Sequence, residues 1–159
     1  MTVLQDSYSR STDGDERERA RCLGLLARAP AELLEAWAAG LGATEFEWLR
    51  QPEQGLVMVQ ARAGGTGERF NFGEMTVTRC VLRLRSGRTG VAYVQGRSKR
   101  RAELAALADA MLQDPELAEA VRNGLIAPVA AHLASESERS ARKAQATKVE
   151  FFTLAHEDD

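Results

Sequence analysis

The chain has 159 residues, 44 % of them hydrophobic and 28 % charged, a balance typical of a globular domain with enough apolar side chains for a core. No apolar run reaches the roughly 20 residues that a membrane-spanning helix needs, so the sequence predicts neither a membrane span nor a secretion signal. The two cysteines lack CxxC spacing, which argues against a redox motif or a zinc site, and we expect buried, reduced thiols and a cytoplasmic location.

The formal net charge of −2 conceals a strong asymmetry along the chain. Residues 62–101 hold ten Lys/Arg and two acids, a net charge of +8, whereas the rest of the chain carries −10. Such separation indicates a local anionic partner, because a basic patch raises the local concentration of anions. A solvated surface with compensating acids on the flanking helices explains the same pattern equally well.

The N-terminal part is predicted to be helical after a disordered start. Residues 1–14 are rich in Ser, Thr, Asp and Gly and show no periodicity, which is typical of disorder. A helix is expected from about Asp15 and a second one after Pro30. In the second helix apolar residues recur at i, i+4 and i+8, namely Leu33, Trp37 and Leu41.

Four strand-like segments follow, at Thr44–Leu49, Gly55–Arg62, Glu74–Arg85 and Thr89–Gly96. The short connections between them predict an antiparallel meander. The third segment alternates between apolar side chains and arginines, so one face would cover the core and the other would present guanidinium groups. These groups repel one another unless an anion or acidic side chains lie between them; they are Arg79, Arg83 and Arg85.

Helical periodicity returns after the strands. Ser98 is an expected N-cap, and Asp114-Pro115-Glu116 has the composition of a further helix start. A long polar helix is expected from Pro128 to about Ala146, followed by the apolar segment Val149–Leu154. Such a helix buries little by itself, so we expect an arm that docks on a partner; a helix folded back onto the domain is the alternative.

The predicted fold class is therefore α+β, with N-terminal helices, a four-stranded antiparallel sheet, and C-terminal helices that end in a docking arm. The predicted organisation is a disordered extension over residues 1–14, a core over residues 15–127, and the arm with an acidic tail over residues 128–159.

The glycine-rich stretch Ala63–Gly67 is a candidate anion site. It is not a P-loop, because the GxxxxGK[ST] spacing is absent and a strand follows, and the same context excludes a Rossmann fingerprint. Backbone N–H groups, the Thr66 hydroxyl and Arg69 could hold an oxyanion, although a plain hairpin turn explains the glycines as well. A second basic cluster, Gly96–Glu103, places four cations at a helix start, where they oppose the helix dipole but attract anions.

Catalytic patterns are sparse in the sequence. The two histidines, His132 and His156, belong to the polar C-terminal part, and no Ser-His-Asp order, HExxH or clustered metal ligands occur. The residues therefore indicate a binding or assembly component without a metal site. A nucleic-acid-binding module is a competing interpretation of the arginine face, disfavoured by the few aromatic residues near it.

The chain resembles the PhnG family, the G subunit of bacterial carbon–phosphorus lyase, over residues 20–154. Four stretches carry the resemblance: GLVMVQARAGGTGERFNFGEMTVTRCVLRL, GRTGVAYVQGR, GLIAPV and VEFFT. It implies an obligatory subunit of a cytoplasmic transferase complex in phosphonate breakdown, with PhnH, PhnI, PhnJ and PhnL as partners. In the implied reaction a phosphonate displaces adenine from MgATP to give α-D-ribose 1-phosphonate 5-triphosphate.

The resemblance also implies that MgATP is a substrate of the complex and that this chain alone binds no cofactor and is not catalytic by itself. No catalytic residue is assigned. Substrate-phosphate contacts are expected, with a subunit-interface role as the alternative, at Gly64, Gly65, Thr66, Gly67, Arg69, Arg79 and Arg97. A scaffold whose basic face binds an acidic partner, without contact to substrate, is the other expectation that stays open.

Overall fold

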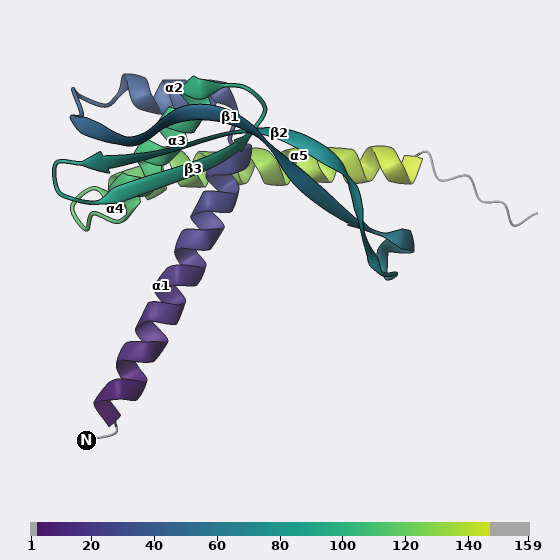
Figure 1. Ribbon diagram of the computed structural model, residues 1–159, viewed down its shortest axis with the longest axis horizontal. Coiled ribbons are helices and arrows are strands. Elements are labelled where there is room, and N and C mark those ends of the chain that lie inside the picture. The colour runs from purple at the N-terminus through teal and green to yellow at the C-terminus, as the bar shows by residue number, and fades with distance from the viewer. Residues whose placement is uncertain (1–2, 147–159) are drawn as a thin grey trace, which may run out of the picture.

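The computed structural model describes residues 3–146, which form an α+β body with three long projections (Figure 1). In chain order the elements are α1 (Val3–Arg28), α2 (Ala31–Ala39), β1 (Phe46–Arg62), the 3-10 turn η1 (Ala63–Gly65), β2 (Arg69–Leu84), β3 (Thr89–Gln95), α3 (Lys99–Leu112), α4 (Ala118–Val121), the π-helical turn η2 (Arg122–Ile126) and α5 (Ala127–Ala146). None of the helices in the described part of the chain has the length and apolar character to cross a membrane.

The sheet is antiparallel, as predicted, but it has three strands in the order β1-β2-β3 where the sequence predicts four. The first two predicted strands are one continuous strand, β1, which includes residues 50–54, where a short connection was predicted. Pro52 is tolerated there because β1 is an edge strand, and register shifts between Trp48 and Glu53 absorb the irregularity.

One face of the sheet packs on the helices, and the predicted alternation of β2 is confirmed. The buried residues of β2 and β3 face the core and pack with α3, namely Cys80, Leu82, Leu84, Ala92 and Val94. The close approach of β3 to α3 requires glycine at position 90, because a Cβ there would fall on the carbonyl oxygen of Ala106 and lie 2.7 Å from the Ala110 nitrogen.

The helix boundaries follow local capping chemistry only in part. Ser98 caps α3 as predicted, its hydroxyl accepting a hydrogen bond from the Arg101 N–H at 3.2 Å. Asp114 instead accepts from the Glu116 N–H in a turn, and α4 begins four residues later, at Ala118. The π-helical turn η2 then includes Asn123 and Gly124 and leads directly into α5. Pro128 is tolerated near this wider turn because it has no N–H to donate to a helical hydrogen bond.

The two ends of the described chain compare differently with the sequence predictions. Residues 3–14, predicted to be disordered, continue α1 as helix, since the docked turns of α1 around Cys22 and Leu26 supply the nucleus from which the helix extends. At the other end α5 buries Val129 and then projects from the body with mostly exposed residues. The predicted docking segment, Val149–Leu154, lies outside the described residues.

The third projection is the outer part of the β1–β2 hairpin. β3 pairs with β2 only from Val77 to Arg83, so residues 56–76 extend past the body as a two-stranded ribbon (Figure 1). We call residues 56–76 the distal hairpin. The glycine-rich stretch, residues 63–67, forms its tip.

Candidate functional site

The tip of the distal hairpin uses its glycines for turn geometry. Gly64 has a φ of 60°, and a Cβ on Gly67 would lie 2.5 Å from the Ala63 carbonyl oxygen, which accepts the Gly67 N–H at 2.8 Å. Two of the predicted phosphate-binding glycines are thus required by the turn itself. The tip stays a candidate anion site because two arginines flank it.

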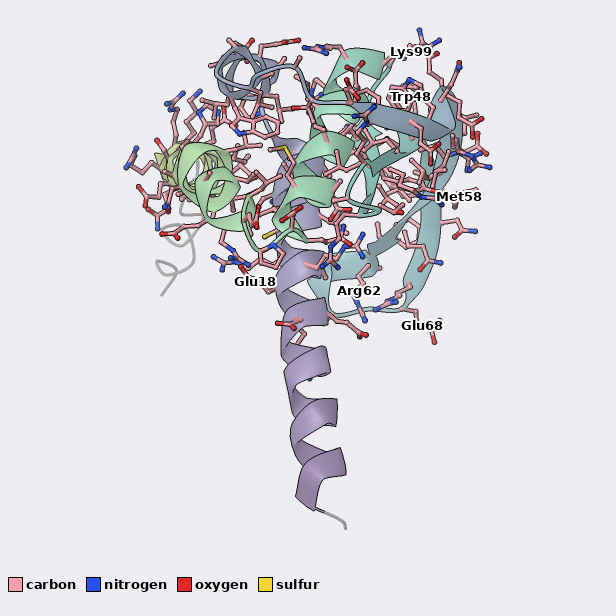
Figure 2. The ribbon with its side chains drawn as sticks, turned by 90° about the vertical axis from the view of Figure 1, so that its left-hand side faces the viewer. Glu18, Trp48, Met58, Arg62, Glu68 and Lys99 are labelled. Carbon is pink, nitrogen blue, oxygen red and sulfur yellow. The ribbon has the colours of Figure 1, made fainter. Side chains whose placement is uncertain are left out.

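Those two arginines, Arg62 and Arg69, are directly opposite each other at the end of the β1–β2 ladder. Arg62 donates to the Gly67 carbonyl oxygen at 3.3 Å, and neither guanidinium forms an ion pair with Glu68 or any other described acid. Figure 2 shows Arg62 and Glu68 at this end of the hairpin. Like charges directly opposite on a ladder repel, so this end of the hairpin favours an anion between the guanidinium groups. Arg62 was missed by the sequence analysis because its pairing with Arg69 is visible only in the register.

The arginines on the exposed face of β2 and beyond its end have acidic partners, in contrast to those at the tip. Three ion pairs join them to the strand β1 and the residue before it: Arg79–Glu53 at 2.7 Å, Arg83–Glu47 at 3.1 Å and Arg85–Glu45 at 2.6 Å. The Glu53 carboxylate raises the pKa of the Arg79 guanidinium by accepting its hydrogen bond. The repulsion expected on this face is therefore relieved within the chain.

The predicted phosphate-binding residues do not form one group. Arg79 lies ten residues along β2 from Arg69, which at about 3.3 Å per residue is roughly 33 Å. Arg97 lies at the base of the hairpin, where its carbonyl oxygen accepts a hydrogen bond from the Gln54 side chain at 3.1 Å. The structure thus places Gly64, Gly65, Thr66, Gly67 and Arg69 together at the tip, with Arg79 and Arg97 far from them.

Two of the four cations at the basic start of α3, Arg100 and Arg101, are bound inside the chain as well. Arg100 pairs with Glu35 at 3.2 Å and Glu103 at 2.6 Å, and hydrogen bonding to Glu35 raises its pKa. Arg101 donates to two backbone carbonyls, those of Ala29 and Gln95. These two arginines hold α3 to its neighbours, which explains why cations are retained where the helix dipole disfavours them.

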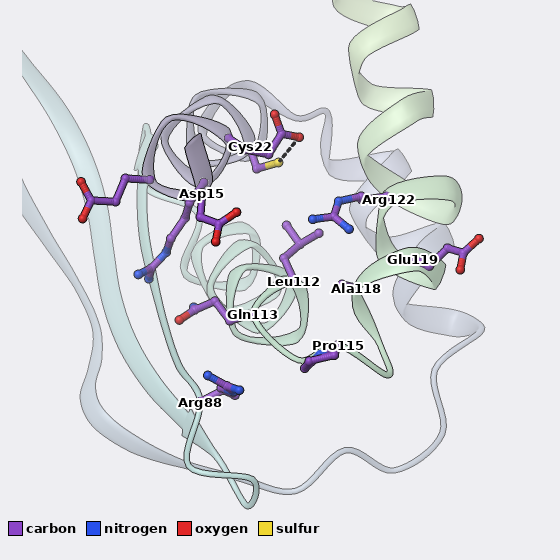
Figure 3. A pocket seen from close by; sticks show the side chains of 12 residues that line it. Asp15, Cys22, Arg88, Leu112, Gln113, Pro115, Ala118, Glu119 and Arg122 are labelled. Carbon is purple, nitrogen blue, oxygen red and sulfur yellow. Dashed lines mark hydrogen bonds between the residues drawn. The ribbon is translucent and has the colours of Figure 1, made fainter. Parts of the chain in front are cut away.

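A pocket of about 660 Å³ lies apart from all these residues, between α1 and the chain that connects α3 to α4 (Figure 3). The Arg88 and Arg122 guanidinium groups face it from opposite sides, and the Asp15 carboxylate points into it. Cys22 also lines it; burial raises the pKa of this thiol, which lies 3.8 Å from Glu18. The charges around the pocket are of both signs and select no class of ligand.

Comparison with known proteins identifies the family. The model of the family described as phosphonate metabolism protein PhnG matches residues 17–156. A relative from Rhizobium meliloti (strain 1021), named alpha-D-ribose 1-methylphosphonate 5-triphosphate synthase subunit PhnG, is 40 % identical over 157 residues, which is 98 % of this chain and all of the relative. The chain belongs to the PhnG family.

The body of this PhnG-family chain is held together by a buried network that sequence reasoning missed. Asp109 is fully buried and accepts hydrogen bonds from the Arg19 guanidinium and, at 2.9 Å, from the Val91 N–H. Gln113 donates to the Thr89 carbonyl oxygen at 2.7 Å beside it. The available signal was the single acid within an otherwise apolar stretch, Leu104–Met111.

Titratable groups elsewhere in this PhnG-family chain form no further cluster among the described residues. No three His, Cys, Asp or Glu side chains in that part converge as metal ligands would. Burial raises the pKa of the Cys80 thiol to about 12, which keeps it neutral in the core. His132 lies 3.8 Å from Glu136 on the exposed side of α5, and His156 lies outside the described residues.

Proposed function

We propose that this chain is an obligatory subunit of the complex that makes α-D-ribose 1-methylphosphonate 5-triphosphate. The observation that carries the proposal is the 40 % identity, over 98 % of this chain, to a subunit of the synthase of that name. On this proposal the complex is a transferase: a phosphonate oxygen bonds to C1′ of the MgATP ribose as the bond from C1′ to adenine breaks.

The proposed role of the chain in that complex is binding, with the catalytic groups supplied by partners. PhnH, PhnI, PhnJ and PhnL are the proposed partners, in the cytoplasm. The arrangement of the arginines supports this division, because Arg79, Arg83 and Arg85 are occupied by glutamates of the chain itself. Arg62 and Arg69, which have no such partners among the described residues, lie together at the hairpin tip, which we propose as the anion-binding part of the chain.

The same ion pairs weigh against a nucleic-acid-binding function. A strand face that tracks a phosphate backbone needs guanidinium groups available to phosphates, and releasing counterions from them drives such binding. The three guanidinium groups at this face of the sheet already contact carboxylates within 3.1 Å.

The proposal is tested by reconstitution. The chain is co-expressed with PhnH, PhnI, PhnJ and PhnL, and adenine released from MgATP in the presence of methylphosphonate is measured by chromatography. We expect adenine release with the chain present and background release when it is left out. Equal release from both preparations would contradict an obligatory role.

A further inference from the structure

The outer edge of β1 changes character where the hairpin leaves the body. Up to Glu53 this edge has two register shifts, and it also carries the charge of Arg50 and the ring of Pro52. Each of these features hinders pairing with another strand. From Gln54 to Ala61 the sequence is QGLVMVQA, with neither a charge nor a proline. The remaining irregularity beside this stretch places its extra residue, Phe72, on β2 and leaves the β1 edge regular.

Four large apolar side chains of the distal hairpin are exposed. Leu56 is 63 % exposed, Met58 54 %, Phe70 46 % and Phe72 74 %. No described helix covers this part of the ribbon: Figure 2 shows Met58, Arg62 and Glu68 on the opposite side of the molecule from α5. A two-stranded ribbon by itself is marginally stable in water. An uncharged strand edge together with large exposed apolar side chains is the composition of a surface that another polypeptide covers.

The tip adds a charge requirement to this surface. Arg62 and Arg69 face each other at its end, and among the described residues neither has an acidic partner. A polypeptide that covers the hairpin therefore gains by presenting carboxylates where the ribbon ends.

A second copy of this chain fits the surface poorly. If residues 54–61 of two copies paired in antiparallel fashion, each tip would meet the base of the other hairpin. The base carries Arg97 and Lys99, which form no ion pair among the described residues, and the Arg97 backbone is bonded to Gln54 at the start of the edge. In that pairing Arg62 would lie opposite Glu53 of the other copy, but this carboxylate already binds Arg79 at 2.7 Å and lies 3.6 Å from Arg50. The tip would therefore meet an occupied acid beside the cations of the base.

We infer that the distal hairpin is the attachment site for a different subunit of the synthase, which adds a strand along residues 54–61 and receives Arg62 and Arg69 with acidic side chains. This inference rests on the proposed function for the existence of such a subunit. The inference adds three things to the proposed function: the surface that is bound, the pairing mode, which is β-augmentation, and the chemistry of the partner.

The test compares charged substitutions at two exposed positions of one strand. Tagged PhnH, PhnI, PhnJ and PhnL are each co-expressed with the wild-type chain, and the dissociation constant is measured for those that co-purify. We expect Met58→Lys to weaken one of these pairs at least about tenfold. Leu49→Lys is the matched control: it is also on β1 and exposed, but it precedes the distal hairpin, so binding should change less than about twofold.

The tip is tested with Arg62→Gln combined with Arg69→Gln, and Arg85→Gln as the control arginine. The double substitution should weaken the same pair at least about tenfold, and the control should not. Far-UV circular dichroism and melting temperatures compare each variant with wild type, since exposed substitutions should leave the body folded. If Met58→Lys binds normally while folded, the inference is wrong.

Two other outcomes would also overturn it. If the double arginine variant assembled fully but raised the KM for MgATP about tenfold, the tip would bind substrate triphosphate and not partner carboxylates. If the chain alone formed a dimer that Met58→Lys dissociated, a second copy would cover the edge. Failure of the proposed function has a different signature: a complex that assembles through the hairpin and releases no adenine.

Discussion

Arg19 and Asp109 lie ninety residues apart in the chain and form a two-point ion pair, with Nε 3.1 Å from Oδ1 and one terminal nitrogen 2.8 Å from Oδ2. The carboxylate is fully buried, whereas the arginine side chain is 41 % exposed. The carboxylate raises the pKa of Arg19 by accepting its hydrogen bonds, so the guanidinium stays charged. The pair fixes α1 against α3 and β3, the elements that carry the core.

Replacing Arg19 with alanine should leave a buried carboxylate without its counter-charge. We expect the free energy of unfolding to fall by about 2 kcal/mol, less than for a fully enclosed pair because water reaches part of the guanidinium. Urea denaturation measures the change. Arg85→Ala, which breaks the exposed pair with Glu45, is the control and should have a much smaller effect; equal losses would contradict the special role of Asp109.

Gly90→Ala should destabilise the body, because the new methyl group has no room against α3. We expect a loss of about 3 kcal/mol in the free energy of unfolding. Gly24→Ala provides the opposite case: nothing lies within 4 Å of a Cβ there, and alanine favours helix, so stability should rise by about 0.5 kcal/mol or more. Thermal unfolding of both variants tests the two predictions. A Gly90→Ala variant as stable as wild type would mean that α3 moves away from β3 easily.

Cys80 should make stability fall at alkaline pH. Burial raises its pKa from 9.0 to about 12, so the folded chain holds the thiol proton more tightly than the unfolded chain does. Its contribution is complete below the unfolded pKa and is lost as the pH rises towards the folded pKa, with a slope of at most about 1.4 kcal/mol per pH unit.

The measurement for Cys80 is the free energy of unfolding of wild type and Cys80→Ala at several pH values. The cavity left by the thiol lowers the free energy of unfolding of Cys80→Ala by the same amount at every pH. Only the slope of the free energy of unfolding against pH, above about pH 9, reports the titration of the thiol. Wild type should lose stability more steeply there. Parallel curves for the two proteins would show that the folded thiol ionises normally.

Exchanging the charges of Arg79 and Glu53 should restore part of what either single reversal disturbs. Arg79→Glu alone places like charges opposite each other on the ladder and should lower the melting temperature. Arg79→Glu with Glu53→Arg should recover part of it, because the new arginine also lies beside Arg50, which is 3.6 Å from Glu53 in the wild type. In the reconstituted complex the double exchange should support adenine release at the wild-type rate. A rate that stays low although stability is recovered would mean that the Arg79 charge contacts substrate.

How much of the fold and of the candidate site could be predicted from sequence depends on how far apart in the chain the interacting residues lie. The alternation of β2 and the Ser98 cap are local and were predicted correctly, because a strand has a fixed period of two and a cap bonds three residues ahead. The predicted number of strands was wrong, because Pro52 indicates a turn unless the strand is known to lie at the edge of the sheet.

Interactions across the sheet needed the register, which sequence does not supply. The sequence predicted an arginine face and left open what neutralises it; the glutamates of β1 do so only because residues 46–62 form one strand. The same register brings Arg62 to Arg69 and separates Arg69 from Arg79. The sequence therefore grouped the residues of the tip but missed Arg62 and the distance from Arg69 to Arg79, and phosphate binding at the tip stays a prediction.

The uncharged edge at residues 54–61 has a consequence for how the chain must be produced. Strand segments of this composition nucleate intermolecular aggregates when they stay uncovered, at a rate that rises with concentration. A cell that made this chain in excess over the subunit that covers its hairpin would accumulate insoluble material. If the proposed attachment holds, balanced synthesis of the two polypeptides is a condition of solubility.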